Sequence, residues 1–212
     1  MIINVAHTKG GVGKTTIAIN LAVDLEADLL DLDLQNSSIL FSKLGDDRKI
    51  NFIQGKSLTK PQLDKLVSLY KSNKDKMLVV DSGGYDSDIV RYMIANSDIV
   101  ITPMAPSQVE LFGLKNFDKI IKKIEEVVPS LKSYILFTRV TQFQKADINA
   151  LRQYLITSMP EFNILKSTIG FRKGFSDAYA QGKSVNEYQP KSKAALEMIA
   201  LVNEVKSILE EK

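Results

Sequence analysis

Near its start the chain reads Lys9-Gly10-Gly11-Val12-Gly13-Lys14-Thr15-Thr16, between an apolar run and an amphipathic segment. The apolar run, residues 2–6, is typical of a buried strand, and Ile17, Leu21 and Leu25 recur afterwards at helical spacing. The glycines therefore lie where a loop meets a helix N-terminus, at which unpaired backbone N–H groups and the helix dipole attract anions. The stretch predicts a phosphate cradle, and with it a nucleotide site.

Each residue type in this cradle suits phosphate binding for a different reason. Glycines at three positions let the backbone curl around the phosphates. The Lys14 ammonium can reach the outer phosphate oxygens, and the Thr15 hydroxyl can hold Mg²⁺. The residues of this loop expected to bind the nucleotide of their own subunit are Gly10, Gly11, Val12, Gly13, Lys14, Thr15 and Thr16.

A second lysine distinguishes this loop from the common G-x-x-x-x-G-K-[ST] pattern. That pattern needs glycine at position 8, where the chain has Thr8, and the chain has Lys9 at the loop entrance instead. The K-G-G-x-x-K-[ST] arrangement resembles the deviant Walker A loop of the ParA/MinD family of ATPases. The resemblance implies that ATP and ADP bind here, and that Lys9 reaches across a nucleotide-sandwich dimer to the phosphates of the other subunit. A solvated loop lysine is the alternative for Lys9.

The length and composition of the chain restrict its class. A chain of 212 residues fits one large α/β domain, so we expect a single domain over residues 1–212. No run of about 18 apolar residues is present, which predicts a cytoplasmic protein. The chain has no cysteine, which excludes disulfides and cysteine-held iron–sulfur clusters. Its one histidine, His7, argues against a histidine-rich metal site.

Basic residues gather in one late part of the chain. Residues 1–138 carry 17 Lys or Arg against 17 Asp or Glu, residues 139–193 carry 9 against 4, and residues 194–212 carry 2 against 4. Such a surplus favours weak, salt-sensitive binding to a polyanion such as DNA, with a solvated basic face as the alternative. No helix-turn-helix signature accompanies it, so contact would be with phosphates and independent of base sequence. The candidates for DNA contact are Arg139, Arg152, Lys166, Arg172, Lys173, Lys183, Lys191 and Lys193.

Apolar runs that end in carboxylates follow along the chain. Residues 28–33 and 77–81 are typical of strands that end at Asp33 and Asp81. Further strands, separated by helical patterns, are expected at 99–103, 133–137 and 163–169. This alternation predicts an α/β fold, with a doubly wound, mostly parallel sheet and helices on both faces. Ligands of such sheets bind beyond the carboxyl ends of the strands, where Thr15, Asp33 and Asp81 can converge.

Other segments also resemble the ParA/MinD family and imply a P-loop NTPase fold of the deviant Walker A class. Residues 33–38 are similar to switch I, with Leu34 where proline is common, and residues 77–81 to the Walker B strand. Residues 81–87 resemble the D-x-G-G-x-D-S segment of small plasmid-borne ParA-like proteins. Thr138 and Arg139 stand where relatives begin the loop over the adenine, although many relatives have Asn-Arg there.

Hydrolysis of the γ-phosphate depends mainly on positioning and charge neutralisation. We expect Lys14 to hold the phosphates, Asp81 to contact the water shell of the metal and Asp33 to orient the attacking water. Thr15, Asp33 and Asp81 form the expected metal site, and Lys9, Asp33 and Asp81 the expected catalytic set. Because Lys9 must come from the other subunit, turnover by the chain alone should be slow. A strand-end cap is the alternative for Asp33, and Asp31 is as consistent with a structural role as with a functional one.

Several helix ends carry local signals. Asp86 is expected to cap the helix that follows it, and Ser107 and Glu110 are expected to form a capping box for the next long helix. The join at Glu26 and Ala27 is short and lacks glycine, so we expect the first helix to be clipped.

The final helix carries an apolar stripe that includes Met198, Leu201 and Val205. A MinD-like protein would lay such a tail on a membrane, which calls for a basic polar face. Here the polar positions include Glu197 and Glu204, so we expect this helix to dock on the body of the protein.

The resemblance implies a ParA-type partition ATPase. In that hypothesis ATP closes a sandwich homodimer, the dimer binds nonspecific DNA at the nucleoid, and a centromere-binding ParB-type partner triggers hydrolysis and release. Plasmid cargo is favoured by the short length, the absence of an N-terminal DNA-binding domain and the segment 81–84. A MinD-like positioning ATPase at membranes is the first alternative. A small-molecule ATP-dependent ligase of the same fold, such as a dethiobiotin-synthetase relative, is the second.

Overall fold

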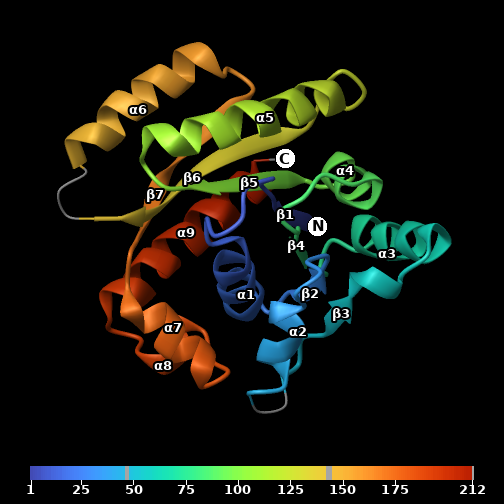
Figure 1. The fold of residues 1–212 in the computed structure, drawn as a ribbon. Helices are drawn as coiled ribbons and strands as arrows, with labels where there is room; N and C mark the ends of the chain where they lie inside the picture. Colours follow the sequence, from blue (N-terminus) through green and yellow to red (C-terminus); the bar gives the residue numbers. More distant parts are fainter. Residues whose placement is uncertain (46–47, 142–144, 212) are drawn as a thin grey trace.

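The computed structural model describes residues 1–45, 48–141 and 145–211 (Figure 1). Strands and helices alternate along most of the chain, as the hydrophobic pattern predicts. The strands are β1 (Ile2–Val5), β2 (Asp28–Asp31), β3 (Phe52–Gln54), β4 (Leu78–Asp81), β5 (Ile99–Met104), β6 (Lys132–Val140) and β7 (Phe162–Gly170). The helices are α1 (Lys14–Asp24), α2 (Ser37–Ser42), the 3-10 turn η1 (Gly55–Ser57), α3 (Lys60–Ser72), α4 (Asp88–Ala95), α5 (Gln108–Glu125), α6 (Lys145–Ser158), α7 (Lys173–Ala180), α8 (Val185–Tyr188) and α9 (Lys193–Glu210).

The strands form one seven-stranded sheet in the order β3-β2-β4-β1-β5-β6-β7, and every pair in it is parallel. The expected doubly wound α/β architecture is confirmed, and the sheet is parallel throughout. Because β1 lies between β4 and β5, the loops after β1, β4 and β5 emerge side by side at the carboxyl edge. The glycine-rich loop after β1, the loop after β4 and the start of α5 are therefore neighbours.

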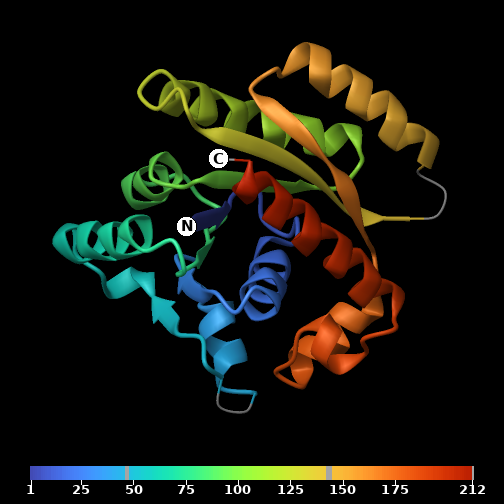
Figure 2. The same cartoon turned by 180° about the vertical axis from the view of Figure 1, so that it is seen from behind.

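Helices cover both faces of the sheet and separate two apolar layers (Figures 1 and 2). One layer packs α3, α4, α5 and α6 against side chains such as Ile2 and Val80. The other packs α1, α7, α8 and α9 against side chains such as Ile3 and Val79. Adjacent residues of one strand thus point to opposite layers, as the two-residue period of a strand requires.

The first helix is short, as expected from its join to β2. It ends at Asp24, and Glu26 takes a left-handed conformation with φ of 51°. A non-glycine residue seldom adopts this conformation, so the reversal is made in few residues at some conformational cost. The result places β2 directly after α1 and fixes where Asp31 and Asp33 emerge.

Two capping assignments made from sequence are wrong. The N-cap of α4 is Ser87, whose side chain accepts a hydrogen bond from the Val90 N–H, while Asp86 pairs with Arg91. At α5, Ser107 occupies the N-cap without a side-chain cap bond, and the Glu110 carboxylate binds Lys9 instead. In both places the carboxylate forms an ion pair, Asp86 with Arg91 and Glu110 with Lys9, because a charge-assisted hydrogen bond is stronger than a neutral capping bond.

The C-terminal helix α9 docks on the sheet as expected, with Met198, Leu201 and Val205 fully buried. It also covers the open edge of β7. The Glu204 carboxylate accepts the N–H groups of Lys166 (2.7 Å) and Ser167 (2.8 Å), and Glu197 accepts the N–H of Gly170 (2.9 Å). Along the described part of the chain, no helix has the length and apolarity needed to cross a bilayer.

Candidate functional site

The glycine-rich loop leads from β1 into α1 with its backbone opened by glycine. Gly13 is the N-cap of α1 at φ of 98°, and Gly11 has φ of 75°. Both values lie in the left-handed region that glycine adopts without strain. The first N–H groups of α1 therefore face a concave loop, which is the arrangement that binds phosphate.

Lys14 turns back into this loop, where its Nζ donates to the Lys9 carbonyl at 2.7 Å. Its side chain is buried, and burial lowers the pKa of Lys14 against the opposing influence of Asp81 and Asp33. A buried cation facing a loop of N–H groups is under-compensated until an anion arrives. Lys14 is thus placed and charged for phosphate binding.

The loop after β4 packs closely on the nucleotide loop and on the loop after β2. A Cβ at Gly84 would lie 3.5 Å from both the Gly10 Cα and the Lys14 Nζ. A Cβ at Gly83 would meet the Tyr85 ring at 2.5 Å and the Asp33 Cα at 3.4 Å. The two glycines therefore permit the three loops to converge.

Asp31 and Asp81 lie on adjacent strands in register, and the Ser38 hydroxyl bridges them. Ser38 Oγ is 2.8 Å from Asp31 Oδ2 and 3.1 Å from Asp81 Oδ2. Asp31 also accepts the N–H groups of Asp33 (2.9 Å) and Ser38 (3.1 Å). Asp31 therefore has a structural role, since its carboxylate holds residues 33–38, the segment that resembles switch I.

Asp81 remains under-satisfied. It is fully buried, and its Oδ1 has no hydrogen-bond partner in the described part of the chain. Burial raises the pKa of Asp81 to about 7, although the Thr15 and Ser38 hydroxyls act in the opposite direction. Such a carboxyl is stabilised as a carboxylate by a nearby cation, so the donor set fits Mg²⁺.

The candidate Mg²⁺ ligands are few. Thr15 supplies a hydroxyl and the buried Asp81 a carboxylate, and the half-buried Asp33 lines the same cavity as Thr15. Within the described residues, no group of three or more His, Asp or Glu could hold a metal by itself. A Mg²⁺ ion here would therefore depend on phosphate oxygens, which is its usual mode in nucleotide sites.

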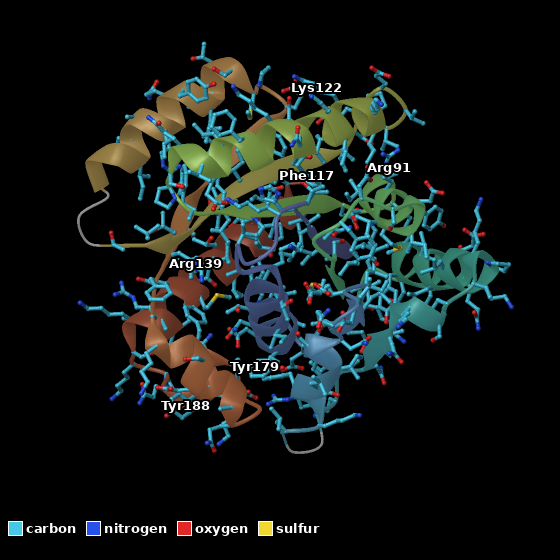
Figure 3. All side chains as sticks on the ribbon, in the orientation of Figure 1. Arg91, Phe117, Lys122, Arg139, Tyr179 and Tyr188 are labelled. Carbon is cyan, nitrogen blue, oxygen red and sulfur yellow. The ribbon has the colours of Figure 1, made fainter. Side chains whose placement is uncertain are left out.

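A cavity of about 810 Å³ extends from the glycine-rich loop to α7. Its floor is the loop from Gly10 to Thr16, with Asp33 and Gly84 on one side. The far wall comes from β6, β7 and α7, among which Figure 3 labels Arg139 and Tyr179. Sequence reasoning did not assign the aromatic residues of this wall, which are Phe171, Phe175 and Tyr179. Aromatic residues after an apolar strand also suit a core, so the sequence carried no signal to separate the two.

Thr138 and Arg139 both line this cavity, in different ways. The Thr138 hydroxyl donates to the Val12 carbonyl at 2.9 Å and is buried, so it ties the glycine-rich loop to β6. Arg139 has φ of 56° and lies 5.7 Å from the centre of the Phe171 ring. The pair Arg139 and Phe171 therefore presents a flat cationic and aromatic surface at the mouth of the cavity.

The expected DNA-contacting residues fall into separate places. Arg172, Lys173 and Lys183 line the cavity wall, whereas Arg152 lines a second, smaller pocket beside β7. Arg172 is paired with Glu197 at 2.7 Å, and Arg152 donates to the Lys166 carbonyl at 3.3 Å. These two arginines are occupied within the chain, and Lys173, whose side chain is 87% exposed, has its Nζ 3.8 Å from Asp177 Oδ2. The candidates that are exposed are Arg139, Lys166, Lys173, Lys183, Lys191 and Lys193.

His7 lies directly before the glycine-rich loop and is buried in its neutral form. Its ring stacks on Phe117 of α5, which Figure 3 labels, with ring centres 5.5 Å apart. Its Nδ1 accepts the Lys9 N–H at 3.2 Å. Burial, with smaller contributions from Lys14 and Lys9, lowers the pKa of His7 from 6.5 to about 4. His7 is therefore a support for the loop.

This shift predicts a pH dependence of stability. Between about pH 7.5 and about pH 5, His7 takes up a proton in the unfolded chain and not in the folded one, so it should lower the free energy of unfolding by about 2 kcal/mol. The free-energy difference between wild type and His7→Asn isolates this effect, because other groups titrate in both proteins. That difference should shrink by about 2 kcal/mol at the lower pH in denaturant titrations. A difference that stays constant with pH would contradict a lowered pKa.

Comparison with known proteins places the chain in a family of nucleotide-binding domains. The family description "CobQ/CobB/MinD/ParA nucleotide binding domain" matches residues 3–185. Protein ParA of Rhizobium radiobacter is 22% identical and the match covers 90% of this chain and 87% of that protein. The maintenance of carboxysome distribution protein A of Gloeobacter kilaueensis is 29% identical, with 90% and 86% covered. The structure of an ATP complex of a Cyanothece McdA variant is similar, with a TM-score of 0.70, 17% identity and 99% and 96% of the two chains covered.

Proposed function

Because the chain belongs to the CobQ/CobB/MinD/ParA nucleotide-binding family, we propose that it is a ParA-type partition ATPase. ATP closes two copies into a sandwich dimer, the dimer binds nonspecific DNA, and a centromere-binding ParB-type partner stimulates hydrolysis. Residues 1–212 act as one domain, in the cytoplasm and on the nucleoid. Among relatives, protein ParA and the carboxysome distribution proteins support a role in partition or positioning.

The observation that carries this proposal is the second lysine of the loop and its surroundings. The Lys9 side chain is 31% exposed, beside the first turns of α5. There Val109 is 68% exposed and Phe112 is 69% exposed, and Leu34 after β2 is 53% exposed. Exposed apolar side chains on α5, the helix whose Glu110 binds Lys9, favour burial against another protein surface. A second copy of the chain, with its own Lys9 at the centre, fits that surface.

The proposed hydrolysis uses groups whose positions are fixed by neighbours. Lys14 and the N–H groups of the loop hold the phosphates, and Asp33 orients the attacking water from the cavity side. Mg²⁺, when bound with Thr15 and Asp81, neutralises charge on the phosphates. Lys9 of the other subunit adds the last positive charge, so turnover is slow until the dimer and its partner assemble.

The proposed DNA contact rests on exposed lysines. Lys173 and Lys183 are exposed and line the cavity wall on the side of α7, so reversing both charges should remove about two phosphate contacts. We expect Lys173→Glu with Lys183→Glu to weaken ATP-dependent binding of a duplex of arbitrary sequence by roughly tenfold at low salt. The slope of log K against log salt should also fall by about 2. Fluorescence anisotropy over a salt series measures both.

A matched pair of substitutions controls for net charge. Lys65 and Lys74 are exposed on and just after α3, on the other side of the sheet from α7. Lys65→Glu with Lys74→Glu changes the total charge equally and should leave the slope unchanged. If both pairs of substitutions weaken DNA binding equally, the binding depends on the total charge of the protein. If neither pair weakens it, Lys173 and Lys183 belong to a solvated basic face that does not contact DNA.

A further inference from the structure

Lys9 is bound within its own subunit through each of its polar groups. Its N–H donates to His7 Nδ1 at 3.2 Å, its carbonyl accepts from Lys14 Nζ at 2.7 Å, and its Nζ lies 2.7 Å from Glu110 Oε1. Glu110 is only 15% exposed in its side chain, so this ion pair is partly shielded from water. Lys9, which in the proposed function contacts the nucleotide of another subunit, is thus bound to residues of its own subunit in this structure.

Helix α5 provides room for this contact through a glycine. A Cβ at Gly113 would lie 3.2 Å from Lys9 Cδ and 3.5 Å from His7 Cε1. The first of these distances is tighter than an ordinary van der Waals contact, so Lys9 would have to move. Glu110 and Gly113 lie on neighbouring positions of one helical face, three residues apart. Glu110 supplies the negative charge that pairs with Lys9, and Gly113 leaves room for the Lys9 side chain.

We propose that Glu110 is a positioning residue that stores Lys9 in cis, and that this ion pair breaks when Lys9 turns to a nucleotide bound by another subunit. We name the contact of Lys9 with Glu110 and Gly113 the lysine latch. The inference rests on the proposed function, because it gives Lys9 its role across the dimer. The inference adds that the free subunit resists dimerisation, because each of the two subunits must break its own ion pair between Lys9 and Glu110.

The charge of the nucleotide explains how the latch could respond to ATP. Glu110 offers Lys9 one negative charge, and its second oxygen, Oε2, is buried without a hydrogen-bond partner in the described residues. Losing Lys9 therefore leaves Glu110 poorly compensated. The triphosphate of ATP carries more negative charge than the diphosphate of ADP, so it competes better for the ammonium. The latch would then favour release of Lys9 to ATP over ADP.

Glu110→Gln tests the latch, because glutamine keeps the size of the side chain and removes its charge. An exposed or partly exposed ion pair is worth up to about fivefold in an equilibrium constant, and two such pairs break per dimer. We expect Glu110→Gln to lower the dimer dissociation constant by up to about 25-fold with a non-hydrolysable ATP analogue and Mg²⁺. Sedimentation velocity measures this constant. With ADP, both proteins should remain monomeric.

A control variant and a second test variant separate the latch from a structural effect. Glu126→Gln removes the same charge from the exposed C-terminal end of α5 and should leave dimerisation unchanged. Gly113→Ala adds one methyl group at a helical position that alanine favours, and it should tighten dimerisation as Glu110→Gln does. Unfolding transitions of each variant show whether the fold is retained.

A further comparison is made in the Lys9→Ala background. There Glu110→Gln should have no effect on self-association, because the residue acts only through Lys9. The latch is overturned if Glu110→Gln dimerises no more tightly than wild type, or if it has the same effect with and without Lys9. If Lys9→Ala itself dimerises as wild type does, the proposed function fails and not the latch alone.

Discussion

Lys14→Ala is expected to lower the affinity for ATP by at least about 100-fold, the largest change in nucleotide affinity predicted for any single residue here. The buried Lys14 ammonium faces the loop of N–H groups and donates a hydrogen bond to the Lys9 carbonyl. Charge-assisted hydrogen bonds to two phosphate oxygens are worth about 1.5–3 kcal/mol each, which gives this factor. Titration calorimetry with ATP and Mg²⁺ measures the loss directly.

The fold should survive this change. Lys14 is a buried cation whose pKa is lowered by burial, so removing it relieves a desolvated charge. The nucleotide-free melting temperature of Lys14→Ala should equal or exceed that of wild type, while the rise on adding ATP should disappear. Lys65→Ala, on exposed α3, is the matched control and should bind normally. Affinity within about threefold of wild type would remove Lys14 from the phosphate site.

Lys9→Ala is expected to separate binding from assembly. Lys9 is held outside the phosphate cradle by Glu110, so its loss should change ATP affinity by less than about threefold. ATP-dependent dimerisation should be lost, and partner-stimulated turnover should fall by at least about 1,000-fold, as for an arginine finger supplied in trans. Light scattering with a non-hydrolysable analogue and a phosphate-release assay report these quantities.

The comparison of the two lysines contains its own control. Lys14→Ala should lose both binding and dimerisation, whereas Lys9→Ala should lose dimerisation alone. Equal loss of ATP binding in both variants would place Lys9 in the cradle of its own subunit and contradict a role across the dimer. A Lys9→Ala protein that still dimerises and turns over normally would make Lys9 a solvated loop lysine.

The sequence predicts this fold well because its strands are short, apolar and separated by amphipathic helices. The order of elements and the parallel sheet follow from that alternation and from the handedness of crossovers. The positions of Lys14, Asp33 and Asp81 also follow, because Lys14 ends the glycine-rich loop after the first predicted strand, and Asp33 and Asp81 end the predicted strands 28–33 and 77–81. The convergence of their loops in the structure agrees with that expectation.

What the sequence could not predict are the partners of polar side chains. Ser107 and Glu110 carry the spacing of a capping box, yet the carboxylate lies 2.7 Å from an ammonium 101 residues away. Thr138 marks the base loop in the family pattern, yet its hydroxyl binds the Val12 carbonyl. Such pairings join segments that are close only after folding, and local spacing contains no information about them.

The cover over β7 has a further consequence for how copies of the chain could assemble. A free outer strand is a template on which another chain can add a strand, and carboxylates from a packed helix occupy several of its N–H groups here. Growth of one continuous sheet from molecule to molecule is therefore opposed along this border. Filaments of this protein, if formed on DNA, would have to be built from surface contacts between compact units, and they could disassemble one unit at a time.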